Sequence, residues 1–242
     1  MAQIAQITDL HLDDFLSKHY QVDTRKNFLN VLDDAQSKGI DQVVLTGDLG
    51  IPESLEWLFA QLSSRRLRFE VILGNHDTFS DFADLGSVAS KKKPGGLYYT
   101  ATVGGEECLF LDSSSGTVGE DQKSWLKREL GRRSGRVVVF VHHPVLDCGN
   151  TTMDRKYPLT NREEVQKIFE DSGLEVVIFC GHYHNRHEQT RGRITQYLTT
   201  SLVVQLEREA EEITMESKNI GYRVIEFSPK AVATEFIPVA NA

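Results

Sequence analysis

The 242-residue sequence has no apolar stretch near the roughly 18 residues that a membrane-spanning helix requires. Its start, MAQIAQITDL, lacks the basic and long apolar segments of a secretion signal. Cysteine is also scarce. Cys108, Cys148 and Cys180 are odd in number and form no CxxC pair, which fits reduced, buried thiols better than disulfides or a zinc knuckle. We therefore expect a cytoplasmic protein that has no membrane partner.

Positive charge is limited, because 27 Lys and Arg face 35 Asp and Glu and leave a net charge of -8. This balance argues against an extended surface for duplex nucleic acid. It does not exclude one small anion, because a metal site can reverse the electric field in its own cleft. The length and the 40% apolar content fit a single α/β domain over residues 1–242. The oligomeric state cannot be predicted from these properties.

Short apolar runs alternate with helical patterns along the first part of the chain. This alternation predicts parallel strands connected by helices. The expected strands are 3–7, 42–46 and 69–73, and the expected helices are 24–39 and 52–62.

The second part combines two more such units with antiparallel hairpins. A hairpin over 97–113 turns at Gly104-Gly105. The helix over 161–173 has Asn161 as N-cap, Glu164 at the capping-box position and Gly173 beyond its end. The other expected elements are a helix over 121–130, strands 136–141 and 175–180, and antiparallel strands near 194–200, 219–227 and 233–239. In this last part only the segment around 205–215 could form a helix, and its acidic run EREAEE fits a solvated loop or helix face.

Polar residues follow five of the apolar strands directly. Since the loops at the carboxyl ends of parallel strands converge on one crevice, these side chains are expected to meet there. They are Asp9, His11, Asp48, Asn75, His76, Asp77, His142, His143, His182 and His184. Each motif alone fits capping groups or core histidines, but five of them in this arrangement indicate a site.

Carboxylates, an amide and imidazoles without cysteine suit first-row ions such as Mn, Fe, Zn or Co. A single catalytic zinc takes three protein ligands, whereas this set offers at least seven. The sequence therefore predicts two metal ions that share a bridging carboxylate.

These motifs resemble the calcineurin-like metallophosphoesterase superfamily, whose pattern is DxH…GD…GNH(D/E)…H…GHxH. Asp9-Leu-His11, Gly47-Asp48, Gly74-Asn75-His76-Asp77, His142 and Gly181-His182-Tyr-His184 carry the resemblance. Further segments are similar to the class III cyclic-nucleotide phosphodiesterase branch of this superfamily. They are VHHP, the MD of TTMD, LTNREEV, LDSS with DQKSWLKREL, and GYRVIEF. The fold that the resemblance implies is a four-layer αββα sandwich, with two mixed β-sheets flanked by helices.

The resemblance also implies a role for each motif residue. One metal ion is expected on Asp9, His11, Asp48 and His184, and the second on Asp48, Asn75, His142 and His182. His142 is preferred to His143 because the family's ligand usually stands two residues before the proline, here Pro144. His76 is expected to face the substrate phosphoryl group, and Asp77 to orient His76 from behind. The 147–160 segment could form a substrate-site loop, with Asp154 and Arg155 as candidate contacts.

The expected function is a dinuclear metal-dependent phosphodiesterase that hydrolyses small anionic, cyclic nucleotide-like diesters by attack of a metal-bridging hydroxide. The same site could instead hydrolyse phosphomonoesters or nucleotide pyrophosphates, or trim nucleic-acid ends. A non-catalytic scaffold of the same fold is a further alternative. Such a scaffold would be expected to have lost ligands or His76, and here all of them are present.

Overall fold

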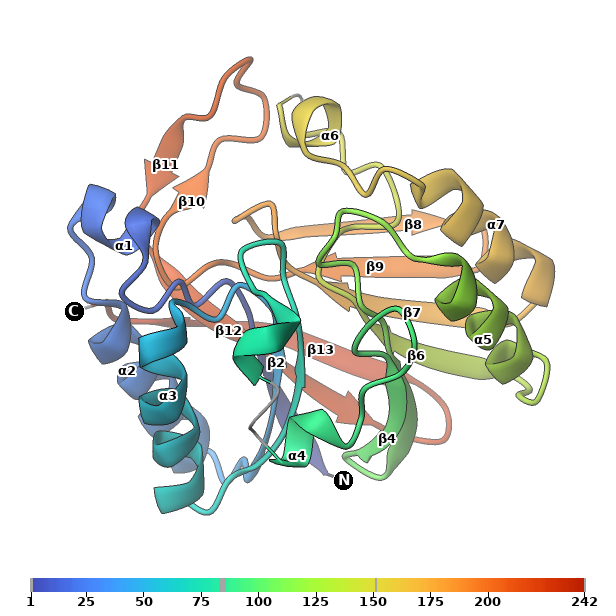
Figure 1. Ribbon diagram of the computed structural model, residues 1–242, viewed down its shortest axis with the longest axis horizontal. Helices are drawn as coiled ribbons and strands as arrows, with labels where there is room; N and C mark the ends of the chain where they lie inside the picture. The colour runs from blue at the N-terminus through green and yellow to red at the C-terminus, as the bar shows by residue number, and fades with distance from the viewer. Residues whose placement is uncertain (1, 83–85, 151, 242) are drawn as a thin grey trace.

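The computed structural model describes residues 2–82, 86–150 and 152–241, and Figure 1 shows two β-sheets with helices on their outer sides. The first sheet has the order β13-β12-β1-β2-β3, and the second has the order β4-β5-β6-β7-β9-β8. The strands of the first sheet are β1 (Gln3–Ile7), β2 (Gln42–Thr46), β3 (Arg68–Ile72), β12 (Ile220–Phe227) and β13 (Val232–Val239). Those of the second are β4 (Tyr99–Val103), β5 (Glu106–Phe110), β6 (Arg136–Phe140), β7 (Glu175–Cys180), β8 (His187–Arg191) and β9 (Ile194–Leu198).

Both sheets are mixed. β1, β2 and β3 run parallel, as do β5, β6, β7 and β9, while β12, β13, β4 and β8 join in antiparallel pairs. The helices are α1 (Phe15–Tyr20), α2 (Thr24–Ser37), α3 (Pro52–Ser64), α4 (Gly86–Ala89), α5 (Glu120–Leu130), α6 (Met153–Lys156) and α7 (Arg162–Ser172), with a 3-10 turn at Phe79–Phe82. A small hairpin of β10 (Gln205–Leu206) and β11 (Met215–Ser217) stands apart from the two sheets (Figure 1).

The side chains of β6 show why the fold has four layers. Val138 and Phe140 pack in the core that also contains the strands of the first sheet, whereas Val137 and Val139 pack with the helices α5 and α7. Successive residues of a strand point to opposite faces, so a run of apolar residues buries both faces of its sheet. The expected αββα sandwich of two mixed sheets and flanking helices is confirmed.

A row of aromatic rings crosses the second sheet on the side that faces the first. Neighbouring rings along it stack with centroids 4.7 to 5.5 Å apart, and the row is Tyr99, Phe110, Phe140, Phe179 and Tyr197. Each ring comes from the next strand of the sheet, so the row ties five strands together by cross-strand contacts.

Most of the predicted elements are confirmed, including the hairpin at Gly104 and Gly105, which both have positive φ. The structure decides against one possibility that the sequence left open and against one local prediction, the capping box of α7. The 205–215 segment forms part of the β10–β11 hairpin and no helix, because the backbone N–H of Leu206 donates to the carbonyl of His184 and pins the chain there. Asn161 is the N-cap residue of α7, but its side chain bonds Val118 instead of the helix, and Glu164 pairs with Lys123 of α5.

Two further observations concern the cysteines and the possibility of a membrane-spanning helix. All three cysteines are free and buried. Within the described ranges, no helix has both the length and the apolar character that a bilayer span requires.

Candidate dinuclear metal site

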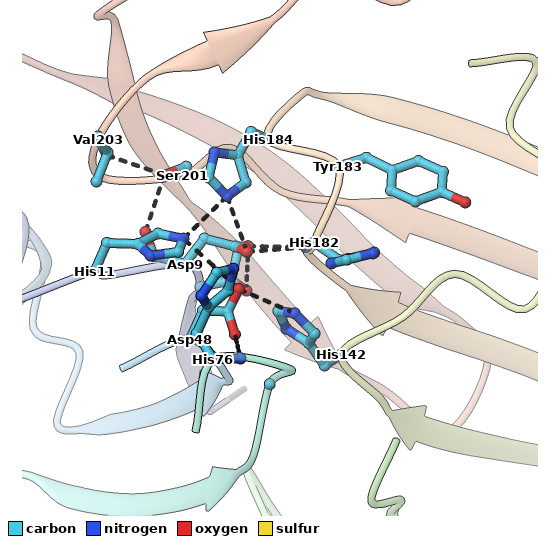
Figure 2. Close-up of polar contacts among 12 residues, drawn as sticks. Asp9, His11, Asp48, His76, His142, His182, Tyr183, His184, Ser201 and Val203 are labelled. Carbon is cyan, nitrogen blue, oxygen red and sulfur yellow. Dashed lines mark hydrogen bonds and ion pairs between the residues drawn. The ribbon is translucent and has the colours of Figure 1, made fainter. Parts of the chain in front are cut away.

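The polar residues that follow the strands lie together at one end of the two sheets (Figure 2). Asp9 and His11 come after β1, Asp48 after β2, and Asn75 and His76 after β3. His142 follows β6 of the second sheet, and His182 and His184 follow β7. The site therefore spans the boundary between the two sheets. Tyr183 points away from it, and its hydroxyl donates to Asp154 at 3.0 Å, so the two histidines of GHYH face the cluster on either side of an outward tyrosine.

Five of these residues have a left-handed backbone, which non-glycine residues adopt rarely. The φ values are 51° for Asp9, 48° for His11, 52° for Asp48, 68° for His182 and 47° for His184. Each such conformation costs on the order of 1 to 3 kcal/mol and persists only where the surrounding structure enforces it. Such strain concentrates at functional sites, and here it turns five side chains toward one centre.

Glycines next to these residues provide the room for this crowding. A Cβ atom at Gly74 would collide with the carboxylate of Asp48, and one at Gly181 would collide with Thr8 and the carboxylate of Asp9. The glycines of the GN and GH pairs therefore leave room for carboxylates that come from other strands.

A first group of donors contains Asp9, His11, Asp48 and His184, all buried, with ligand atoms within 4.8 Å of one another. Nε2 of His184 lies 3.1 Å from Nε2 of His11 and 3.3 Å from Oδ1 of Asp9. Nε2 of His11 lies 3.6 Å from Oδ2 of Asp48. Two imidazole nitrogens and two carboxylates facing one point are a donor set that suits a first-row cation.

A second group contains Asp48, His142 and His182. Oδ2 of Asp48 lies 3.4 Å from Nε2 of His142, and Oδ1 of Asn75 lies 3.2 Å from the same nitrogen. The two groups thus share Asp48, and the seven residues expected as ligands lie together. His143 belongs to neither group, since its Nδ1 lies 2.8 Å from the hydroxyl of Ser113.

The far nitrogens of three histidines are held in place by hydrogen bonds. Nδ1 of His11 meets Oδ2 of Asp14 at 2.6 Å, and Nδ1 of His142 meets the carbonyl of Thr46 at 2.8 Å. Nε2 of His182 donates to the carbonyl of Tyr157 at 2.8 Å. Such bonds fix the tautomer and leave the other nitrogen for the site, as is usual around protein-bound metals. The buried Nδ1 of His184 has no partner in the part of the chain that the structure describes.

The charges of the site are balanced by protons when no metal is considered. Burial alone would lower the pKa of His142, but Asp48 outweighs it and raises that pKa to about 10. The pKa of Asp48 lies well below its usual value despite burial, because His142 and His11 oppose its protonation. Burial and the neighbouring His142 lower the pKa of His182 to about 4. The two carboxylates therefore stay ionised and attract positive charge, which a proton on His142 supplies here, and the donor set fits two cations.

His76 and Asp77 lie beside this cluster. The His76 ring is exposed, its centroid is 5.3 Å from that of His11, and its backbone N–H donates to Asp48 at 2.9 Å. Asp77 does not contact the His76 ring that it was expected to orient. Its two carboxylate oxygens accept from the backbone N–H groups of Leu49 (2.9 Å) and Gly74 (2.8 Å), so it holds the turn that carries His76 rather than the His76 ring. Burial first, and Asp48 second, raise the pKa of Asp77 to about 7.

A cavity of about 540 Å³ opens above the cluster. Its floor contains Asp48, Asn75, His76, His182 and His184, and its walls are largely apolar. The wall side chains come from α1, the β10–β11 hairpin and the 147–160 segment, and of these the sequence analysis expected only the 147–160 segment at the site. They include Phe15, Leu16, Tyr20, Met153, Tyr157, Val204, Leu206 and Ile213.

Within the 147–160 segment, Met153 and Tyr157 line the cavity, and the two candidate contacts do not. Asp154 accepts hydrogen bonds from the backbone of Cys148 and Asn150 and pairs with Arg162, whereas Arg155 donates to the carbonyl of Glu211. The side chain of Asp14 was also missed as a partner of His11. Asp14 stands at the N-cap position of α1, where it accepts from the N–H of Ser17, and this position is the signal in the sequence that could have located it.

The αββα fold and the two overlapping donor groups define the class of protein, a hydrolase with a site for two metal ions. The chain belongs to the calcineurin-like phosphoesterase family, whose family model matches residues 2–186. It is therefore a hydrolytic phosphoesterase.

Two curated relatives and one solved structure illustrate the similarity. A probable cyclic nucleotide phosphodiesterase of Fibrobacter succinogenes is 31% identical over 96% of this chain and 92% of its own length. The 3',5'-cyclic adenosine monophosphate phosphodiesterase CpdA of Escherichia coli K12 is 27% identical over 96% of this chain and 87% of its own length. A dimetal phosphatase from Danio rerio superposes with a TM-score of 0.71 at 12% identity, covering 100% of this chain and 99% of the other, which shows a shared fold.

Proposed function

We propose that the protein is a phosphodiesterase that uses two metal ions to hydrolyse cyclic nucleotides or similar small diesters. The observation that carries this proposal is the position of Asp48 in both donor groups, beneath an open cavity where His76 is exposed. The printed functions of the two curated relatives support the choice of cyclic nucleotides as substrate class.

The proposed ligands are Asp9, His11, Asp48 and His184 for one ion, and Asp48, Asn75, His142 and His182 for the other. Nitrogen and oxygen donors without cysteine favour Mn, Fe, Zn or Co. When bound, two such ions supply the Lewis acidity that stabilises a phosphoryl group and acidifies water. The buried thiols support the proposal that the protein works in the cytoplasm, where cysteines stay reduced.

The chain's own residues would bind and orient the diester. His76 lines the cavity. Its backbone N–H, and not its ring, donates the hydrogen bond to Asp48. Its imidazole is placed to donate a hydrogen bond to the phosphoryl group or a proton to the departing alkoxide. Asn75 presents a neutral amide and so adds no negative charge on the side where an anion would enter. The apolar walls limit the access of bulk water to the floor.

The test is a substrate screen with the manganese-loaded protein. It contains 3′,5′- and 2′,3′-cyclic nucleotides, glycerophosphodiesters, short oligonucleotides, and bis- and mono-p-nitrophenyl phosphate. We expect turnover of cyclic nucleotides and a higher kcat/KM for the bis than for the mono ester. A preference for the mono ester, together with inert cyclic nucleotides, would assign the site to phosphomonoester hydrolysis.

A further inference from the structure

Large apolar side chains are exposed around the mouth of the cavity. Among the described residues four are strongly exposed: Phe15 (75%), Ile213 (49%), Tyr157 (47%) and Met215 (41%). The first three line the cavity, and they come from α1, from the β10–β11 hairpin and from the residue after α6. Figure 1 shows these three elements at the same end of the molecule. Apolar groups exposed together from separate segments indicate a binding surface.

Each of the three segments is hydrogen-bonded to a different histidine of the metal cluster. Asp14, which caps α1 by accepting from the N–H of Ser17, contacts Nδ1 of His11 at 2.6 Å. The carbonyl of Tyr157 accepts from His182 at 2.8 Å. In the hairpin, the backbone N–H of Leu206 in β10 donates to the carbonyl of His184 at 2.8 Å. The three segments that carry the apolar side chains are therefore anchored beside the floor.

The ring of Phe15 also has support from within α1. It stacks on His19, four residues further along, with centroids 5.6 Å apart and planes 20° from parallel, and His19 meets Tyr20 edge to face at 4.8 Å. The outer face of Phe15 stays exposed. A pre-positioned ring with one free face is suited to stack on a second planar group.

The size and polarity of the cavity indicate what it holds. About 540 Å³ lies within the range of roughly 300 to 1,000 Å³ that is usual for small-molecule sites. Its ligand must present an anion to the floor and an apolar, flat part to the walls. Away from the floor, the lining includes the phenol groups of Tyr20 and Tyr157 and the carboxylate of Asp14, which is already bonded to His11 and Ser17. Among the described residues, this lining contains no Gln, Ser, Thr, Lys or Arg side chain that could hydrogen-bond the edge of a nucleobase.

We propose that Phe15, Tyr157 and Ile213 form a base-binding face, which holds the nucleobase of the substrate by stacking and apolar contact while the phosphodiester lies on the histidine–aspartate floor. This inference rests on the proposed function and adds a selectivity to it. The face discriminates cyclic nucleotides from cyclic phosphates that lack a base, but it distinguishes poorly between adenine and guanine. Strong discrimination between the two would require several side chains that hydrogen-bond the edge of the base, whereas the described walls offer for this the hydroxyls of Tyr20 and Tyr157 and the already bonded carboxylate of Asp14.

The kinetic test compares 3′,5′-cyclic AMP, 3′,5′-cyclic GMP and the base-free 1-deoxyribose 3′,5′-cyclic phosphate. For the wild-type protein we expect kcat/KM values within about tenfold for the two purine nucleotides. Phe15→Ala and Tyr157→Ala should each raise KM for cyclic AMP about 5- to 100-fold, the range measured for loss of one base-stacking ring. For the base-free substrate, the same substitutions should raise KM far less. Tyr157→Ala keeps the backbone carbonyl that accepts from His182.

Met215→Ala is the matched control, because Met215 is also an exposed apolar residue of the hairpin but does not line the cavity. It should change none of these values, and Phe15→Tyr should restore the KM lost in Phe15→Ala. Thermal unfolding of each variant shows whether the fold is intact. Equal losses for cyclic AMP and the base-free substrate, or a purine preference above about a thousandfold, would overturn the base-binding face.

A binding experiment separates this inference from the proposed function. Calorimetric titration with 5′-AMP and with ribose 5-phosphate measures the contribution of the base without turnover. Tighter binding of AMP that is lost in Phe15→Ala supports the face, even if no cyclic nucleotide is hydrolysed and the proposed function fails. Equal affinities for the two ligands in a protein that does hydrolyse cyclic nucleotides would overturn the face alone.

Discussion

Nδ1 of His11 lies 2.6 Å from Oδ2 of Asp14, and the same carboxylate caps α1. One side chain therefore orients a proposed metal ligand and anchors a wall of the cavity. Asp14→Asn should lower the affinity for one metal ion about 10- to 100-fold, the usual effect of losing the group behind a ligand histidine. Calorimetric titration of the metal-free protein with Mn²⁺ measures this change.

Asp23→Asn provides the control for that substitution. Asp23 caps α2 by accepting from the N–H of Lys26, and it is exposed and has no histidine partner. Both substitutions remove the charge of an N-cap carboxylate but keep a capping oxygen, because Asn is about as good an N-cap as Asp. If Asp23→Asn lowered metal affinity as much as Asp14→Asn, the effect would arise from general destabilisation rather than from His11.

Asp48 is the carboxylate shared by the two donor groups. Asp48→Asn should therefore remove both metal ions together, whereas Asp9→Asn, which affects one group, should leave the second ion bound. The measurement is the metal content per chain by elemental analysis after dialysis, with circular dichroism as a check on folding. Retention of two ions by Asp48→Asn would contradict the bridging role.

The exposed ring of His76 can be removed without disturbing the contact of its backbone with Asp48. His76→Ala should keep full metal content and lower kcat about 10²- to 10⁴-fold, the contribution of a positioned acid. His187→Ala is a suitable control, because His187 lies in β8 and neither lines the cavity nor belongs to a donor group. A loss of metal in His76→Ala would show that His76 is a ligand instead.

Metal binding should strengthen as the pH rises. The pKa of His142 is raised to about 10, so this ring is cationic at neutral pH in the metal-free protein, and the pKa of His11 is raised in the same direction by Asp14 and Asp48 despite burial. A ligand nitrogen must lose that proton, so protons compete with the metal up to about pH 10. His182, with a pKa near 4, is already neutral in this pH range and releases no proton when it binds a metal. Titrations in buffers of different ionisation enthalpy count the protons released, and a pH-independent affinity between about pH 7 and 9 would refute this.

The same pKa affects the stability of the metal-free protein. The pKa of His142 is raised from 6.5 to about 10 on folding. Its stabilising contribution is therefore fully present below pH 6.5 and is lost as the pH rises through about 10. Denaturant unfolding of the metal-free protein at a series of pH values should show this decrease.

The floor of the site could be predicted from the sequence because every floor residue follows a recognisable strand. Parallel strands bring their carboxyl ends together, so the position of Asp48 along the chain also indicates its position in space. Of the walls, only the 147–160 segment was expected at the site, and the sequence did not indicate which of its side chains line the cavity. α1 is too short to show a helical period, and Tyr157 and Ile213 reach the cavity only through the packing of separate loops.

The assignments of Glu164 and Asp77 fail for a similar reason, which is that each side chain bonds partners other than the one that the sequence pattern suggests. Glu164 stands where a capping box would place it, yet it pairs with Lys123 from another helix. Asp77 follows His76 directly, yet the turn directs its carboxylate to the N–H groups of Gly74 and Leu49. Tertiary contacts thus override local patterns.

Asn75 supplies a neutral oxygen 3.2 Å from Nε2 of His142, at a place where a carboxylate would also fit. Asn75→Asp would add a negative charge beside Asp48 and reduce the positive potential that two bound cations give the floor. A unit charge about 5 Å away contributes about 3 kcal/mol at an effective dielectric constant near 20. KM and the inhibition constant of inorganic phosphate should therefore rise at least about tenfold, while metal affinity also changes. Asn219→Asp adds the same charge at an exposed position outside the cavity and should leave both constants unchanged. An unchanged KM with full kcat in Asn75→Asp would show that a neutral amide is not required there.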